Sequence, residues 1–247
     1  MRLAVTVEDG ADEQSAAALA ERLGLEMLAD IPPPDMLLLV RTSERLELRE
    51  SGPAAGGTLA VEFLPGRGSP QLRRAAMPGG RAAATGAPPR LIDATAGLAQ
   101  DAFALAEWGC RVDLIERSPV VAALLADGLE RARRDGRTGD AASRMHLHQG
   151  EALDILPRLK PAGVVYLDPM YPRSGREGRK GKGMRLLREL LGDDRDAHTL
   201  LEAARRAAGR RVVVKRPLRA PALAGHKPSG SLTGTTVRYD LYGPLRD

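Results

Sequence analysis

Residues 90–97 read Arg90-Leu-Ile-Asp-Ala-Thr-Ala-Gly97, a short apolar run that ends in an acid and continues in small residues. A second apolar run, Val112–Ile115, ends at Glu116, and a third, Val164–Leu167, ends at Asp168. Between these runs, apolar residues recur at helical spacing. This alternation predicts an α/β fold with a doubly wound, mostly parallel sheet that is covered by helices on both faces.

The segment after residue 89 is expected to alternate strands and helices to its end. Ser118 and Pro119 form a strong helix start, because serine is a favoured N-cap and proline fits the first helical position. Asp101 is expected to cap the preceding helix. The expected elements are strands 90–93, 112–115, 145–148, 164–167 and 211–214, helices 101–109, 119–129, 152–159, 184–191 and 200–208, and a final edge strand 235–241.

Residues 1–63 are expected to form a small N-terminal α/β domain. Residues 64–89 are basic, rich in Gly and Pro and almost free of periodicity, so they are interpreted as a linker. Residues 90–247 are then the second, larger domain. The N-terminal domain is expected to contain strands Leu3–Val7, Met36–Val40 and Leu59–Phe63, a weaker strand Leu46–Leu48, and a helix Asp12–Leu23 that Gly24 ends.

The charge of the chain is concentrated in blocks. The 247 residues carry 37 Lys and Arg against 32 Asp and Glu, a net charge of +5. Residues 1–62 carry −7 and residues 91–170 carry −3, whereas residues 63–90 carry +5 and residues 171–247 carry +10. Basic blocks can neutralise phosphates and therefore indicate a nucleic-acid partner, with a solvated charged surface as the alternative.

Several protein classes are excluded by simple counts. The one cysteine, Cys110, excludes an internal disulfide framework and suits a reducing compartment. We find no apolar run long enough to span a membrane and no secretory signal, so a cytoplasmic protein is expected. His146 and His148 alternate on one expected strand without a cysteine or acid at ligand spacing, and no metal site is expected.

The ends of the expected strands carry the candidate binding residues. In parallel α/β sheets the ligand lies beyond the carboxyl ends of the strands, near the point where the strand order reverses. Glu116, at one such end, could accept hydrogen bonds from both ribose hydroxyls of a nucleoside. The G-x-G-x-x-G pattern is absent, which weighs against a dinucleotide and favours S-adenosylmethionine (SAM). The alternative is that Asp93 and Glu116 only cap neighbouring helices.

The tetrapeptide Asp168-Pro-Met-Tyr171 follows the third apolar run. Its carboxylate could accept a hydrogen bond from an exocyclic amine, Pro169 stiffens the turn, and the ring of Tyr171 could stack on a base. The alternative is an ordinary tight turn, since Asp-Pro turns are frequent.

This tetrapeptide resembles the D-P-P-Y or N-P-P-Y motif of methyltransferases that act on exocyclic or amide nitrogens. Residues 90–219 are more specifically similar to the bacterial small-subunit ribosomal RNA guanine-N2 methyltransferase J family, and the basic segment Leu72–Arg81 resembles that family's segment before the methyltransferase core. The similar segments are Asp93–Leu98, Asp101–Phe103, Gly109–Val112, Glu116-Arg117, Pro119–Leu125, Val164–Met170 and Arg211–Pro217.

The resemblance implies a Rossmann-like class I methyltransferase fold and SAM as the cofactor. The sequence departs from the family at Gly97-Leu-Ala-Gln-Asp101, where the family has Gly-Leu-Gly-Arg-Asp, and at Gly150-Glu151, which replaces a pair of serines. The candidate cofactor-binding residues are Asp93, Ala94, Gly97, Gln100, Asp101, Glu116, Arg117, Gly150, Glu151 and Asp168.

The implied reaction is methylation of guanine N2, a poor nucleophile whose lone pair is delocalised into the ring. Hydrogen bonds from its protons to Asp168 would orient that lone pair toward the methyl group, so that positioning and charge complementarity lower the barrier. Asp168, Pro169, Met170 and Tyr171 form the candidate catalytic set. Cys110 is interpreted as a packed residue and not as a nucleophile.

Basic residues near the catalytic turn are candidates for binding RNA phosphates. The stretch 173–185 holds six basic groups and one acid among glycines. Lys215 and Arg216 end another expected strand at the same sheet edge as Asp168 and could extend the phosphate path. The candidate RNA-binding residues are Arg73, Arg74, Arg81, Arg173, Arg176, Arg179, Lys180, Lys182, Lys215 and Arg216.

The sequence therefore predicts transfer of a methyl group from SAM to N2 of a guanosine in small-subunit (16S) ribosomal RNA, with that RNA or the assembled small subunit as partner. One alternative is an N-methyltransferase acting on DNA adenine or a protein amide. Another is a non-catalytic RNA-binding ribosome assembly factor, against which the intact Asp93, Glu116 and Asp168 argue.

Overall fold

The structure of the chain is a computed structural model, and it describes residues 2–29, 32–52, 57–77, 88–170, 182–191 and 197–245. The chain divides into two compact units, each of which is described by itself. The first unit comprises Met1–Glu62, Ala123–Arg131 and Met170–Asp193, and the second comprises Phe63–Ala122, Ala132–Pro169 and Asp194–Asp247. The two units therefore differ from the expected domains, which were divided at residues 63 and 89. The segments Ala123–Arg131 and Met170–Asp193 group with the N-terminal residues.

A mixed sheet forms the centre of the first unit, in the strand order β2-β1-β3-β4-β5. Strand β1 is parallel to β2 and β3, whereas β4 is antiparallel to β3 and β5. Asp12 caps the expected helix by accepting a hydrogen bond from the Ser15 amide, and the left-handed Gly24 ends it. The elements are β1 (Arg2–Val7), α1 (Glu13–Leu23), β2 (Glu26–Leu28), β3 (Met36–Arg41), β4 (Leu46–Glu50), β5 (Thr58–Leu59) and α7 (Lys182–Leu191).

The second unit is built on a seven-stranded sheet in the order β11-β12-β10-β9-β6-β7-β8. Its elements are α2 (Pro70–Ala76), β6 (Arg90–Asp93), α3 (Gln100–Glu107), β7 (Arg111–Glu116), α5 (Gly139–Ser143), β8 (Met145–Gln149), α6 (Ala152–Ile155), η1 (Leu156–Arg158), β9 (Ala162–Leu167), α8 (Ala197–Ala207), β10 (Ala208–Pro217), η2 (Leu223–Gly225), β11 (Gly230–Thr233) and β12 (Val237–Tyr242). Helix α4 (Pro119–Arg134) contributes residues to both units.

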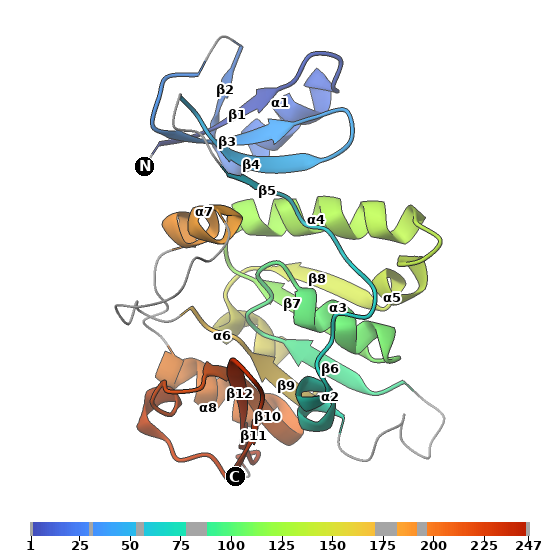
Figure 1. Cartoon of the computed structure of the whole chain (residues 1–247), viewed down its shortest axis with the longest axis vertical. Coiled ribbons are helices and arrows are strands. Elements are labelled where there is room, and N and C mark those ends of the chain that lie inside the picture. Colours follow the sequence, from blue (N-terminus) through green and yellow to red (C-terminus); the bar gives the residue numbers. More distant parts are fainter. Residues whose placement is uncertain are drawn as a thin grey trace. The chain divides into compact units, whose positions relative to one another are not determined.

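The expected doubly wound sheet is confirmed in this unit. Strands β10, β9, β6, β7 and β8 are parallel to their neighbours, and β11 and β12 add an antiparallel edge. The parallel strands carry consecutive buried residues, such as Leu91 and Ile92 in β6 and Val212–Val214 in β10, as expected for a sheet covered on both faces. The strand order reverses between β6 and β9, which lie side by side in Figure 1.

Three expectations about local structure are wrong. Residues 64–89 contain helix α2, which is capped by Ser69 and contacts α3 and β12, so this part of the segment belongs to the second unit rather than to a linker. Helix α3 begins after Ala99 and is not capped by Asp101. The last strand, β12, pairs on both sides, so that β11 forms the edge. None of the helices in the described part of the chain is long and apolar enough to cross a membrane.

Candidate active site

The carboxyl ends of β6 and β9 meet at the reversal of strand order, and one residue, Thr95, joins them through its amide and its hydroxyl. Asp93, at the end of β6, is 2% exposed and accepts a hydrogen bond from the Thr95 amide at 3.1 Å. The Thr95 hydroxyl in turn accepts a hydrogen bond from the Asp168 amide at 2.6 Å. Ligands bind at such reversal points in open α/β sheets. Thr95 therefore holds the carboxylate of Asp93 and the backbone of Asp168 at one place on the sheet edge.

Asp93 has an unusual electrostatic environment. Burial raises the pKa of its carboxyl to about 8, the Thr95 amide opposes that shift, and the charges of Asp101 and Asp168 add to it. At neutral pH the carboxyl is therefore mostly protonated. An approaching cation would favour its ionised form, because an opposite charge lowers the pKa of an acid.

Glu116, at the end of β7, holds two neighbouring loops. One carboxylate oxygen accepts a hydrogen bond from the Gly97 amide at 2.8 Å, and the other accepts from the Ser118 amide at 2.7 Å. Glu116 is 5% exposed, and its carbonyl accepts a hydrogen bond from the Gly150 amide. Glu116 thus stabilises the start of helix α4, which agrees with the alternative interpretation that it caps a neighbouring helix. Because a carboxylate oxygen has two lone pairs, this role is compatible with an additional bond to a ribose hydroxyl.

The loop between β6 and α3 approaches the site with an unusual backbone. Gly97 has φ +51° and Ala99 has φ +54°, so both residues lie in the left-handed region. Glycine adopts this region readily, whereas alanine does so at a cost. Ala99 occupies the position at which the resembling family has glycine, and it is 3% exposed. Alanine at this position therefore carries local backbone strain that glycine would not.

A lysine connects two carboxylates beside this loop. The Lys215 ammonium, on β10, lies 2.8 Å from an Asp101 oxygen and 3.0 Å from an Asp168 oxygen. The Tyr166 hydroxyl donates to the same Asp101 oxygen at 2.5 Å. Burial opposes the charged form of Lys215, but the Asp168 and Asp101 charges outweigh it and hold the pKa of Lys215 above its usual range. Burial, followed by the nearby carboxylates, raises the pKa of Tyr166, which therefore remains a hydrogen-bond donor.

The site combines several acids with one cation. Glu116 is a buried acid and Asp101 a half-buried one, and 42% of the Asp168 side chain is exposed, so a substrate group can reach it. Lys215 compensates part of this negative charge. Such a site favours a ligand that carries positive charge, and it can accept hydrogen bonds from an amine.

The remaining candidate cofactor residues surround the strand ends in different ways. Ala94 is buried, and its amide donates to the Tyr166 carbonyl at 3.0 Å. Gln100 is exposed, and its side-chain amide donates to the Leu98 carbonyl at 3.3 Å. Arg117 is half-buried directly after Glu116.

Gly150 and Glu151 lie between β8 and α6. Gly150 has φ +142°, and a Cβ atom there would lie 3.1 Å from the Cδ1 atom of Ile155, so this position favours glycine on both counts. Glu151 is exposed at the start of α6. Of the candidate catalytic residues, Pro169 is buried, Met170 is half-buried and grouped with the first unit, and Tyr171 lies outside the described residues.

Two predicted RNA-binding residues have other partners. Lys215 bonds to Asp101 and Asp168, so its predicted contact with phosphate is replaced by a role inside the site. Arg216 is 2% exposed and donates to the Pro221 carbonyl, and burial, followed by the charge of Arg238, lowers the pKa of Arg216 to about 10. A buried guanidinium cannot contact a phosphate in solution, so the prediction for Arg216 is wrong.

The exposed arginines of helix α2 remain available for RNA. Arg73 and Arg74 are both exposed, and the Arg73 guanidinium lies 5.6 Å from the centre of the Trp108 ring. The predicted residues Arg81, Arg173, Arg176, Arg179 and Lys180 lie outside the described residues, as does the side chain of Lys182.

Sequence reasoning missed the connecting residues of the site. Thr95 and Tyr166 were not candidates, and Lys215 was assigned to another role. A hydroxyl two residues after the strand-end Asp93 was the only local signal for Thr95. No local signal marks Tyr166 and Lys215, because their bonds to Asp101 join residues 65 and 114 positions apart.

Comparison with known proteins places the chain among methyltransferases. A family model described as "Putative SAM-dependent methyltransferase" matches residues 18–244. A protein named ribosomal RNA small subunit methyltransferase J from Thioalkalivibrio sulfidiphilus is 46% identical over 237 residues, which cover 93% of this chain and 92% of the relative. A protein of the same name from Dechloromonas aromatica is 45% identical over 242 residues, covering 92% of this chain and 94% of the relative.

A solved structure shares the fold over nearly the full length. The crystal structure of a SAM-dependent methyltransferase from Neisseria gonorrhoeae superposes with a TM-score of 0.73 at 32% sequence identity. The superposition covers 97% of this chain and 96% of the other. The similarity therefore includes residues of both units, and the Rossmann-like sheet lies in the second.

Proposed function

This chain belongs to the ribosomal RNA small subunit methyltransferase J family, and from that premise we propose that it methylates the exocyclic N2 of a guanosine in small-subunit (16S) ribosomal RNA. It is a SAM-dependent methyltransferase with the class I fold. The observation that carries the proposal is the Thr95–Asp168–Lys215 arrangement, which fixes an exposed carboxylate at the reversal of strand order.

The residues at the strand ends suit SAM by their chemistry. The cofactor carries an ammonium and a sulfonium cation, and the site offers Asp93, Asp101 and Glu116 close to a loop that Gly97 allows to approach closely. Asp93 would ionise next to a cation, which converts its costly burial into a favourable interaction. Glu116 would accept hydrogen bonds from the ribose hydroxyls. When bound, the cofactor supplies an electrophilic methyl group.

Asp168 is proposed to position the target amine. Its carboxylate would accept a hydrogen bond from one N2 proton, which orients the nitrogen lone pair and disfavours other approaches. The Lys215 ammonium would limit the rotation of the Asp168 carboxylate, since the two groups are 3.0 Å apart. The amine becomes positively charged as the new bond forms, so the fixed negative charge of Asp168 is more favourable in the transition state than before it. The surplus proton can then leave through Asp168 to water.

Small-subunit RNA or the assembled small subunit is the proposed partner. The support is the name of the relatives, ribosomal RNA small subunit methyltransferase J, together with the +10 charge of residues 171–247 and the exposed Arg73 and Arg74. Arginines bind phosphates through paired hydrogen bonds, so these side chains suit an RNA backbone. Since this substrate is made and assembled in the bacterial cytoplasm, the protein is proposed to act there.

A labelling experiment tests the proposed substrate class. Purified protein is incubated with methyl-labelled SAM and, separately, with naked small-subunit RNA, assembled small subunits, DNA and a total protein extract. Label is expected in the RNA-containing samples, and an Asp168→Asn variant that still binds SAM should transfer none. Label in DNA or protein would support the alternative N-methyltransferase activities. Label in no sample, with SAM binding intact, would support a non-catalytic assembly factor.

A further inference from the structure

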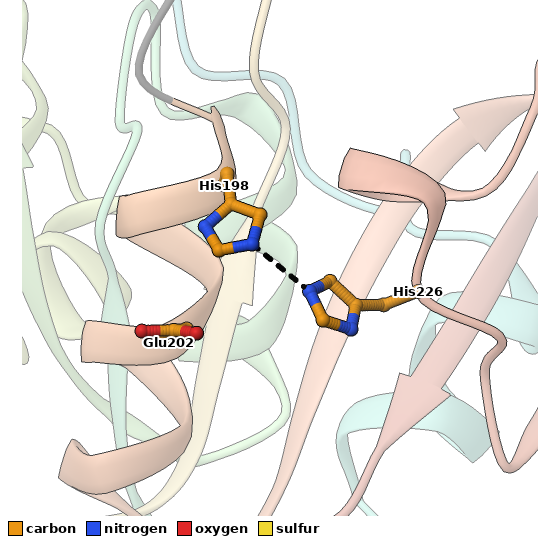
Figure 2. A group of neighbouring side chains, drawn as sticks. All are labelled: His198, Glu202 and His226. Atoms are coloured by element: carbon orange, nitrogen blue, oxygen red, sulfur yellow. Dashed lines mark hydrogen bonds between the residues drawn. The ribbon is translucent and has the colours of Figure 1, made fainter.

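Three metal-ligating side chains gather in the second unit, apart from the residues of the candidate active site. His198 and Glu202 lie on helix α8, and His226 follows directly after η2 (Figure 2). One potential ligand atom from each residue lies within 4.8 Å of the other two. The sequence-based expectation of no metal site was argued from His146 and His148 and did not take this cluster into account, so the proposal below departs from that expectation.

The cluster joins two segments that are distant in sequence. His198 and Glu202 are four positions apart on one helix and therefore share a face. Across from them, the Nε2 atom of His226 lies 3.3 Å from the Nε2 atom of His198, and the two rings point toward each other in Figure 2. In tetrahedral zinc sites with Zn–N distances of about 2.0–2.1 Å, two imidazole nitrogens are separated by about 3.3–3.4 Å. The Nε2–Nε2 spacing of the two histidines thus matches the spacing that a shared ion requires.

The backbone on the loop side holds His226 in place. The His226 amide donates to the Leu223 carbonyl at 3.0 Å, and the His226 carbonyl accepts a hydrogen bond from the Tyr242 hydroxyl at 3.1 Å. Leu223 and Tyr242 are buried. Ala224 and Gly225, immediately before His226, both have positive φ, so a tight turn directs the imidazole toward α8.

The helix side of the cluster is equally fixed. Leu200 and Leu201, between the two helical ligands, are 5% and 0% exposed and anchor α8 in the second unit. His198 itself is exposed and Glu202 is half-buried, so solvent and ions reach the cluster. Preorganised ligands on both sides reduce the ordering that binding an ion would require.

We propose that His198, Glu202 and His226 bind a zinc ion, which links helix α8 to the segment that follows β10. Two imidazoles and a carboxylate suit Zn²⁺ and similar transition-metal ions, whereas Mg²⁺ and Ca²⁺ require sets of oxygen ligands. Three protein ligands leave one tetrahedral position for water or a group of a partner molecule. The Arg206 guanidinium, 4.0 Å from a Glu202 oxygen, is the competing cation at this carboxylate.

The alternative to an ion is a hydrogen bond between the two imidazoles. At 3.3 Å one neutral ring can donate Nε2–H to the other, and no metal is then needed. Direct binding measurements distinguish the two arrangements, because a hydrogen-bonded pair without an intrinsic site takes up no ion.

The test uses full-length, tag-free protein that has been treated with a chelator. Titration calorimetry with ZnCl₂ should show one equivalent bound, and MgCl₂ should show none. His198→Ala and His226→Ala should each weaken zinc binding by more than about tenfold, with a smaller loss for Glu202→Gln. His146→Ala is the matched control, because it removes an exposed histidine outside the cluster, and it should bind zinc as the original protein does.

A second readout guards against variants that lose their fold. Zinc should raise the melting temperature of the original protein and of His146→Ala, raise that of Glu202→Gln by less, and leave that of the double variant His198→Ala/His226→Ala nearly unchanged. Absence of zinc binding to the original protein would overturn the proposal. So would zinc binding of equal strength in the double variant His198→Ala/His226→Ala, because the ion would then use other ligands.

Discussion

Lys215 offers the sharpest distinction between a residue that positions Asp168 and a residue that binds RNA. Lys215→Met keeps the length of the side chain and removes the charge that lies 2.8 Å from Asp101 and 3.0 Å from Asp168. Because 26% of the Lys215 side chain and 42% of the Asp168 side chain are exposed, water screens part of these attractions.

The expected loss of free energy of unfolding in Lys215→Met lies between the losses for a buried ion pair and for a surface ion pair. Removing one partner of a fully buried pair costs about 3–5 kcal/mol, and an exposed pair contributes about 0–1 kcal/mol. We therefore expect Lys215→Met to lower the free energy of unfolding by about 2 kcal/mol. A hydrogen bond to a charged group contributes about 1.5–3 kcal/mol, so loss of the fixed Asp168 should reduce kcat by roughly 10- to 150-fold.

The assay measures kcat and KM for small-subunit RNA with labelled SAM, at several salt concentrations. Arg74→Met, an exposed change on helix α2, serves as the contrast: it should raise KM for RNA and reduce its dependence on salt while kcat persists. Lys215→Met should lower kcat and leave KM for RNA and its dependence on salt nearly unchanged. If Lys215→Met raised only KM for RNA and left kcat intact, Lys215 would bind phosphate and the positioning role would be refuted.

Three further predictions concern the strand ends and the loop between them. Because its pKa is raised, Asp93 keeps a proton in the folded protein that the unfolded chain releases above about pH 4. The free energy of unfolding should therefore fall as the pH rises toward 8. Urea unfolding between pH 5 and 8 should show a shallower fall of this free energy in Asp93→Asn. An equal decline in both proteins would contradict the ionisation assigned to Asp93. Thr95→Val leaves the Asp168 amide without its hydroxyl acceptor and should lower the free energy of unfolding by about 0.5–1.5 kcal/mol, while Thr95→Ser retains the bond and should resemble the original protein. Ala99→Gly relieves about 1–2 kcal/mol of left-handed strain, offset in part by unfolded-chain entropy, and should raise the free energy of unfolding by about 0.5–1 kcal/mol. The same change within helix α3, Ala102→Gly, should lower the free energy of unfolding. If both variants lowered the free energy of unfolding, Ala99 would be unstrained.

The strand ends could be predicted because their pattern is local. Buried parallel strands consist of consecutive apolar residues, so the first polar residue after each run marks the carboxyl end. Asp93 and Glu116 are the last residues of β6 and β7, and Asp168 directly follows β9, as predicted. The helix start at Ser118-Pro119 is equally local and is also confirmed.

The predictions that were wrong concern features that depend on contacts with residues distant in the sequence. Asp101 has the chemistry of an N-cap, yet the left-handed Ala99 takes that position and Asp101 bonds to Tyr166 and Lys215 instead. Helix α2 has seven residues and depends on tertiary contacts, so its sequence alone resembles a loop. Lys215 and Arg216 are both basic, and only the folded sheet shows that one enters the site and the other is buried.

The central claim is that Asp168 presents a guanine amine for methylation, and nucleoside analysis tests it most directly. Small subunits from cells that lack this protein are treated with the protein and isotopically methyl-labelled SAM, and their RNA is digested to nucleosides for mass spectrometry. We predict that the label appears in N2-methylguanosine with the original protein and is absent with an Asp168→Asn variant that retains SAM binding. Label in any other nucleoside, or undiminished N2-methylguanosine with Asp168→Asn, would contradict the account.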